Sequence, residues 1–159
     1  MIGIKTPLFA LICAGVLVIS CKSIKQQITS NPNFQYLSIQ KNGCFGECPM
    51  YTLELDSEQR LTLTGHRFFQ YIGEYQSKFS DESMRRLLSK LEKCTWGVYK
   101  KQYLTGYSDL PSTVVRFSNS EGDTSQVIYE NDLAPNEVID VVDLLDNSIQ
   151  ESIWNKVDD

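Results

Sequence analysis

The sequence has very little of the chemistry on which common enzyme sites depend. His66 is its single histidine among 159 residues, whereas zinc hydrolases and Ser/His/Asp hydrolases need histidines at defined positions. The chain contains no G-x-S-x-G, H-E-x-x-H or phosphate-loop motif. It therefore supplies no catalytic residue, indicates no cofactor and favours a role other than catalysis.

Two pairs of adjacent carboxylates have simpler explanations than acid–base catalysis. Asp81 and Glu82 fit the first turn of a helix, and Asp158 and Asp159 end the sequence. A glycosidase would use two carboxylates from distant parts of the chain, and sequence alone does not give their separation. That alternative stays open, with no particular pair to favour it.

The chain also lacks any concentration of positive charge. It carries 15 Lys and Arg against 20 Asp and Glu, and the basic pairs Arg85–Arg86 and Lys100–Lys101 are isolated. Binding to nucleic acid requires a basic cluster, so nucleic acid is excluded as a partner. A hydrophobic content of 42%, without repeats or low-complexity tracts, predicts one folded domain.

The longest apolar run, Leu8–Ile19, is shorter than the roughly 20 residues that span a bilayer. Lys5 precedes it and Cys21 follows it, which is the pattern of an export signal. The residues "VISC" that end at Cys21 resemble the bacterial lipobox. This resemblance implies cleavage before Cys21 and acylation of its new N-terminus, with a secreted protein carrying a chance cysteine as the alternative.

These features predict a lipoprotein signal peptide over residues 1–20, a tether over 21–33 and a single globular α+β domain over 34–159. The acylated Cys21 would make the membrane a partner, because more than one acyl chain anchors a protein stably. No Asp lies beside Cys21, which by resemblance to known sorting signals favours the outer membrane of the cell envelope.

Period-two alternation predicts a run of strands in the N-terminal half of the domain. It is clearest in "MYTLELD", where Tyr51, Leu53 and Leu55 share one side. Similar patterns over 34–40, 60–66 and 67–79 predict further short strands. Together they indicate an antiparallel meander.

Two helices and a hairpin are predicted in the second half. Ser80 is placed as the N-cap of an amphipathic helix over 81–94, and Pro135 precedes a second helix over 136–153. The segments 112–118 and 124–130 form a hairpin around "NSEGD". The fold class is therefore α+β, with the meander and the C-terminal hairpin in one sheet and both helices packed on it.

A family resemblance rests on "CFGECPMYTLEL", Gly65, "LPSTVVRF" and "APNEVIDVVDLL". Together these look like the envelope domain described as domain of unknown function 6438, over roughly Leu37 to Ile149. The resemblance implies a small, exported and usually lipid-anchored protein, and it implies no activity, cofactor or catalytic residue.

Three cysteines remain in the predicted domain: Cys44, Cys48 and Cys94. In an oxidising envelope the near pair, Cys44 with Cys48, is the favoured disulfide, and Gly46 permits a tight loop between them. Cys94 lies on the apolar stripe of the first helix and would be a buried thiol. Pairing of Cys94 with either of the other two remains open.

Two functional alternatives compete with a structural disulfide. "CFGECP" resembles the Cys-x-x-x-Cys-Pro of envelope copper chaperones, which implies Cys44, Cys48 and His66 as metal ligands; the other alternative is a redox dithiol. In thioredoxin-like proteins such a motif opens a helix, whereas the residues after Pro49 alternate as a strand. We therefore favour the structural disulfide.

Aromatic residues gather in the link between the first helix and the hairpin. Trp96, Tyr99, Tyr103 and Tyr107, with Asp109, form a candidate binding surface, since Tyr and Trp offer contact area with a polar group. Packing against the core is the interpretation we favour. The sequence as a whole predicts a non-catalytic binding or structural module with an envelope protein or cell-wall partner.

Overall fold

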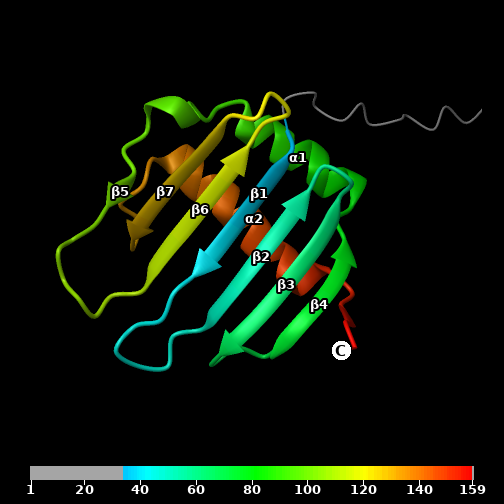
Figure 1. Ribbon diagram of the computed structural model, residues 1–159, viewed down its shortest axis with the longest axis horizontal. Helices are drawn as coiled ribbons and strands as arrows, with labels where there is room; N and C mark the ends of the chain where they lie inside the picture. The colour runs from blue at the N-terminus through cyan, green and yellow to red at the C-terminus, as the bar shows by residue number, and fades with distance from the viewer. Residues whose placement is uncertain (1–33, 159) are drawn as a thin grey trace, which may run out of the picture.

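The computed structural model describes residues 34–158, which form one eight-stranded sheet with two helices on one of its faces (Figure 1). The predicted signal peptide, the tether and Cys21 lie outside the described residues. Within the described range, no helix is both long enough and apolar enough to cross a membrane. The α+β class predicted from the sequence is confirmed.

The sheet has the strand order β5-β7-β6-β1-β2-β3-β4-β8. Its strands are β1 (Tyr36–Lys41), β2 (Met50–Asp56), β3 (Arg60–Arg67), β4 (Gly73–Lys78), β5 (Gln102–Tyr103), β6 (Ser112–Ser118), β7 (Thr124–Glu130) and β8 (Asn155–Lys156). The meander β1 to β4 and the hairpin of β6 and β7 are both present. They join through β1, which pairs antiparallel with β2 on one side and with β6 on the other.

The sheet is mixed, so the predicted antiparallel meander with a hairpin is correct only in part. β5 pairs in parallel with β7, through Gln102 with Ile128 and Tyr103 with Tyr129. β8 adds an antiparallel strand beside β4. Both additions are two residues long, and two residues cannot show the alternation by which strands are recognised in a sequence.

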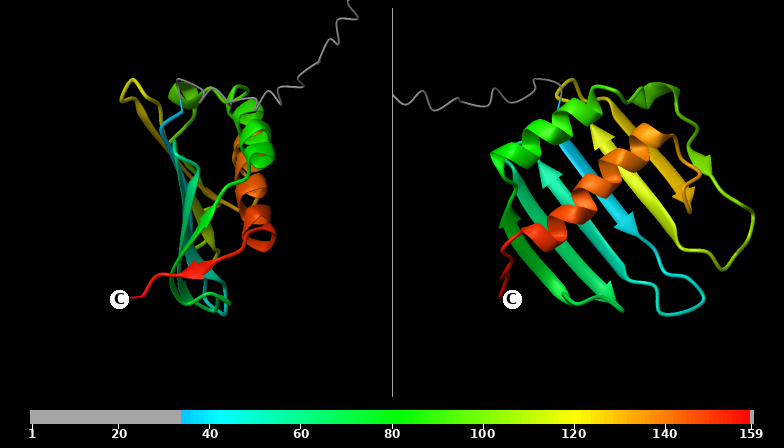
Figure 2. Two further views of the ribbon diagram at one scale, coloured as in Figure 1. Left: turned by 90° about the vertical axis from the view of Figure 1, so that its right-hand side faces the viewer. Right: turned by 180° about the vertical axis from the view of Figure 1, so that it is seen from behind.

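Strand alternation divides the sheet into a covered and an open face. Leu37, Leu53, Leu63 and Val115 are fully buried under α1 (Asp81–Leu91) and α2 (Asn136–Glu151), which lie together on one side in Figure 2. The open face is mainly polar. On it Arg116 donates to Gln40 at 3.1 Å and to Gln126 at 3.0 Å.

The helix boundaries follow from capping and from the apolar stripes. The Ser80 side chain accepts a hydrogen bond from the Ser83 amide at 3.0 Å, which confirms the predicted N-cap. α1 ends at Leu91, before Cys94, so the predicted helix was too long. Pro135 is the residue before α2, and the predicted inward residues of α2 are buried: Val138, Val141, Val142, Leu145 and Ile149.

The loop between β3 and β4 folds back over Gly65. Phe69 from this loop stacks on Tyr51 with ring centroids 4.4 Å apart. A Cβ atom at Gly65 would overlap the carbonyl oxygen of Tyr71 and come within 2.9 Å of the Phe69 ring. The missing side chain at position 65 therefore lets the loop close against the sheet.

We predict that Gly65→Ala lowers the free energy of unfolding by about 1–3 kcal/mol, because the loop backbone must move to admit the methyl group. Urea denaturation monitored by circular dichroism measures this loss. Gly97→Ala is the matched control, since nothing lies within 4 Å of a Cβ at that position. Equal stability of the two variants would contradict the close approach at Gly65.

Candidate functional site: the disulfide end of the sheet

A disulfide closes the loop between β1 and β2 at one end of the sheet. Cys44 and Cys48 are bonded, and their Cα atoms are 5.6 Å apart, which confirms the favoured pairing. β2 begins at Met50, so the chain is extended immediately after Pro49, as predicted. No helix begins at this cysteine pair, in contrast to the thioredoxin-like arrangement.

Cys94 is a free thiol, half-buried just beyond the end of α1. Its sulfur lies 3.5 Å from the carbonyl oxygen of Glu137 and 3.6 Å from that of Lys90, and the thiol donates to them. Burial, helped by the nearby Glu137 and Asp140 carboxylates, raises the Cys94 pKa to about 11. The thiol is therefore protonated near neutral pH and is a poor nucleophile.

His66 lies on β3 with its side chain exposed. Across residues 34–158, no group of three or more His, Cys, Asp or Glu side chains is arranged to hold a metal ion. In the bonded form, Cys44 and Cys48 offer no thiolate to a metal.

The aromatic link predicted as a candidate binding surface separates into two parts. Trp96, Tyr99 and Tyr103 pack against the core. Trp96 stacks on Phe117 with ring centroids 4.9 Å apart, and the Tyr99 hydroxyl donates to the Glu137 carboxylate at 3.0 Å. Tyr107 and Asp109 are exposed. Asp109 lies near the disulfide, because its carbonyl accepts a hydrogen bond from the Phe45 amide at 3.4 Å.

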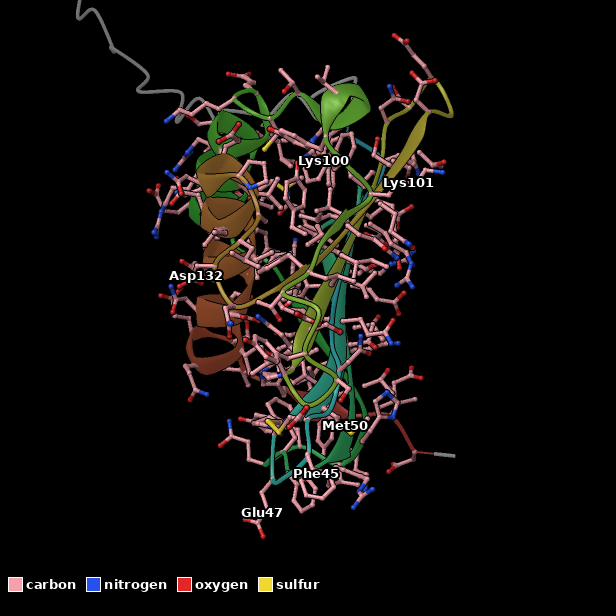
Figure 3. The ribbon with its side chains drawn as sticks, turned by 90° about the vertical axis from the view of Figure 1, so that its left-hand side faces the viewer. Phe45, Glu47, Met50, Lys100, Lys101 and Asp132 are labelled. Carbon is pink, nitrogen blue, oxygen red and sulfur yellow. A yellow bond between two sulfur atoms is a disulfide. The ribbon has the colours of Figure 1, made fainter. Side chains whose placement is uncertain are left out.

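Exposed apolar side chains gather on the outer side of the disulfide loop. Phe45 is 94% exposed and Phe68 is 46% exposed, and both line one hollow of about 350 Å³, together with Met50 and Arg67. We call these four residues the aromatic tip. Figure 3 shows Phe45 at one end of the molecule and Lys100 at the other.

The backbone holds the aromatic tip in an unusual form. Phe68 has a φ of 53°, a left-handed conformation that bulky residues rarely adopt and that is found mainly where surrounding structure enforces it. The Arg67 guanidinium lies over the Phe68 ring, 4.9 Å from its centroid, in a cation–π contact. Two neighbouring loops thus hold large apolar groups out in water.

A cleft of about 360 Å³ lies on the inner side of the same disulfide loop, between α2 and the ends of β1, β2, β6 and β7. We call it the α2 cleft. Its lining includes Lys41, Tyr51, Cys48, Tyr129, Asp143 and Asp146. The disulfide therefore forms part of a wall that separates two different surfaces.

Three side chains from three elements meet in the α2 cleft. Asp146 on α2 accepts a hydrogen bond from the Tyr51 hydroxyl at 2.7 Å and pairs with the Lys41 ammonium at 2.9 Å. Burial raises the pKa of Tyr51, and the Asp146 carboxylate raises it further. Sequence reasoning missed this cluster, since Tyr51 sits among apolar neighbours and Asp146 among the acidic residues of a surface helix.

A protein-family model matches residues 35–149, and its description is Domain of unknown function (DUF6438). The chain belongs to this family. The match includes the disulfide loop, the aromatic tip and the α2 cleft, so all three lie within the DUF6438 domain. Comparison with curated proteins gives no match.

We predict that peptide mapping of the unreduced DUF6438 protein recovers Cys44 and Cys48 in one disulfide-bonded peptide. Cys94 should react with iodoacetamide more slowly in the native than in the urea-unfolded chain at neutral pH. Its native rate should rise as the pH approaches about 11, because the raised pKa keeps the thiol protonated below that pH. Equal native and unfolded rates at neutral pH would contradict the burial of Cys94.

Proposed function

We propose that this DUF6438 protein is a lipid-anchored protein of the bacterial envelope, held at the outer membrane through an acylated Cys21. Its domain is a non-catalytic binding module that contacts another envelope protein through the aromatic tip. The anchor is supported by the apolar run and the "VISC" pattern of the sequence. The contact surface is supported by the geometry of the disulfide end.

The observation that carries the binding role is the exposure of Phe45 on a covalently closed loop. Burying a phenylalanine side chain contributes about 1.5–3 kcal/mol, and the free domain forgoes most of that by leaving Phe45 94% exposed. A partner that covers the ring would recover it. Because the disulfide already restricts the loop, less conformational entropy is lost when the interface forms.

The direction of β1 separates the aromatic tip from Phe34, the residue at which a tether would enter the domain. The first described residue, Phe34, lies just before β1, whereas the disulfide loop follows the last residue of β1, Lys41. A strand of six residues extends for about 20 Å. The tip therefore lies about the length of β1 from the point at which a tether would enter, which favours a protein partner over the bilayer.

We predict that Cys21→Ser abolishes incorporation of labelled palmitate and moves the full chain from the membrane fraction to the soluble fraction. The reason is that acyl chains on Cys21 would be the anchor. Cys94→Ser serves as the control, because Cys94 lies half-buried in the folded domain. Membrane association that survives Cys21→Ser without label would sink the anchoring proposal.

We predict that Phe45→Ala combined with Phe68→Ala removes a crosslinked product formed by the full chain in intact cells. Both rings are exposed, so the melting temperature should change little. Val98→Ala is the matched control, because Val98 is an apolar side chain that is 81% exposed in the 3-10 turn Trp96–Val98, away from the aromatic tip. Identical crosslinked products from all three chains would rule out the tip as the contact surface.

A further inference from the structure

The α2 cleft carries an excess of negative charge that its own residues do not neutralise. Its lining contains one cationic residue, Lys41, and three carboxylates, on Asp132, Asp143 and Asp146. Lys41 is paired with Asp146. Asp132 and Asp143 form no ion pair with any residue in the described part of the chain, so two carboxylates face the cleft without a counter-charge.

Buried phenols form the wall opposite α2. Tyr129 is only 4% exposed yet lines the cleft. The Tyr51 hydroxyl donates to Asp146, whereas the Tyr129 hydroxyl is hydrogen-bonded to the side chain of Thr113, which also lines the cleft. Burial raises the pKa of Tyr129 to about 12; the Thr113 hydrogen bond opposes this rise, and all three cleft aspartates add to it. Because the Thr113 hydrogen bond lowers this pKa, Thr113 donates to the Tyr129 oxygen. Tyr129 keeps its own proton, for which no acceptor is found within residues 34–158.

The cleft already accommodates one alkylammonium group. The Lys41 chain reaches in from the end of β1 and places its ammonium nitrogen 2.9 Å from an Asp146 oxygen, beside the Tyr51 hydroxyl that bonds the other oxygen of the same carboxylate. Ile139 lies on the same stripe of α2 as Asp143 and Asp146, at helical spacing. This stripe thus combines an apolar contact with carboxylates.

We propose that the α2 cleft binds a primary ammonium group carried on an aliphatic stem. The ammonium group pairs with Asp143 and Asp132, and the stem lies against Ile139 and the Tyr129 ring, since amphipathic chains bury their methylenes and leave the charge paired. The Tyr129 hydroxyl, which accepts from Thr113, donates its own proton to a carbonyl group next to the stem. This site is separate from the aromatic tip and does not depend on the role proposed for it.

The same chemistry occurs in a free alkyl diamine and in a lysine residue within a peptide, and the Tyr129 hydroxyl distinguishes the two. A peptide-borne lysine has amide carbonyls to accept that hydrogen bond, whereas a diamine has none. The two unpaired carboxylates give the cleft a net negative charge. This charge repels anions, so an anionic ligand is disfavoured.

Titration calorimetry of the full chain in detergent tests the proposal with three probes: Nα-acetyl-lysine methylamide, its Nε-acetylated form and 1,5-diaminopentane. We expect the first to bind, and the Nε-acetylated form to bind at least about tenfold more weakly, because it lacks the charge. Equal affinity for these two probes, or no heat from either ammonium probe at millimolar concentration, overturns the proposal.

Substitutions in the α2 cleft test whether the probes bind there. Asp143→Asn should weaken binding of both ammonium probes by about tenfold, whereas Tyr129→Phe should weaken only the lysine derivative. Glu121→Gln is the control, because Glu121 is an exposed carboxylate in the turn between β6 and β7. Unchanged affinity in Asp143→Asn overturns the proposal, while the chain with Phe45→Ala and Phe68→Ala should bind the probes as the wild type does.

Discussion

The whole structure depends on the burial of one sheet face beneath α1 and α2. Leu37, Ile39, Leu53 and Leu63 lose all contact with water on that face, and each such burial contributes about 1.5–3 kcal/mol. The two helices cover the middle of the sheet, and at the disulfide end the strands and their loops extend past the main apolar contacts. Both surfaces discussed above lie at this end: the aromatic tip on its loops, and the α2 cleft between the strand ends and α2.

At that end, one short covalent loop shapes two surfaces of opposite character. Closing so small a loop stabilises the fold by about 2 kcal/mol on the chain-entropy account, a modest share of the total. Its larger effect is local. Phe45 projects from the loop into solvent, while Cys48 and Pro49 line the cleft on the other side.

The fold was predictable from the sequence wherever a periodic pattern ran for several residues. β2, with Tyr51, Leu53 and Leu55 on one side, and α2, with its row of inward valines and leucines, are the clearest cases. The N-cap at Ser80 was equally predictable, because it depends on a single local hydrogen bond, from the Ser83 amide to the Ser80 side chain. The parallel pairing of β5 was not, since it depends on where the aromatic link crosses back to β7 and not on any local pattern.

The candidate site was harder to predict, because its parts come together only in the fold. The favoured Cys44–Cys48 pairing is local and was recovered. In contrast, the Lys41, Tyr51 and Asp146 cluster joins residues up to 105 positions apart along the sequence, and nothing in the local pattern around any of the three points to the others. Trp96 and Tyr99 pack inward while Tyr107 does not, a division set by how the link lies on the sheet.

The position of β1 in the middle of the sheet has a consequence for how the chain acquires its shape. β1 can pair with β2 as soon as the first hairpin forms. Its other edge stays unpaired until β6 is present, and β6 lies about 70 residues further along the chain, as the contact of Asn42 with Ser112 shows. Until then β1 offers an unpaired edge of apolar residues, which is a template for association with other chains. Long-range pairing of this kind slows folding, so the interval before β6 arrives is when a nascent chain most needs protection from its neighbours.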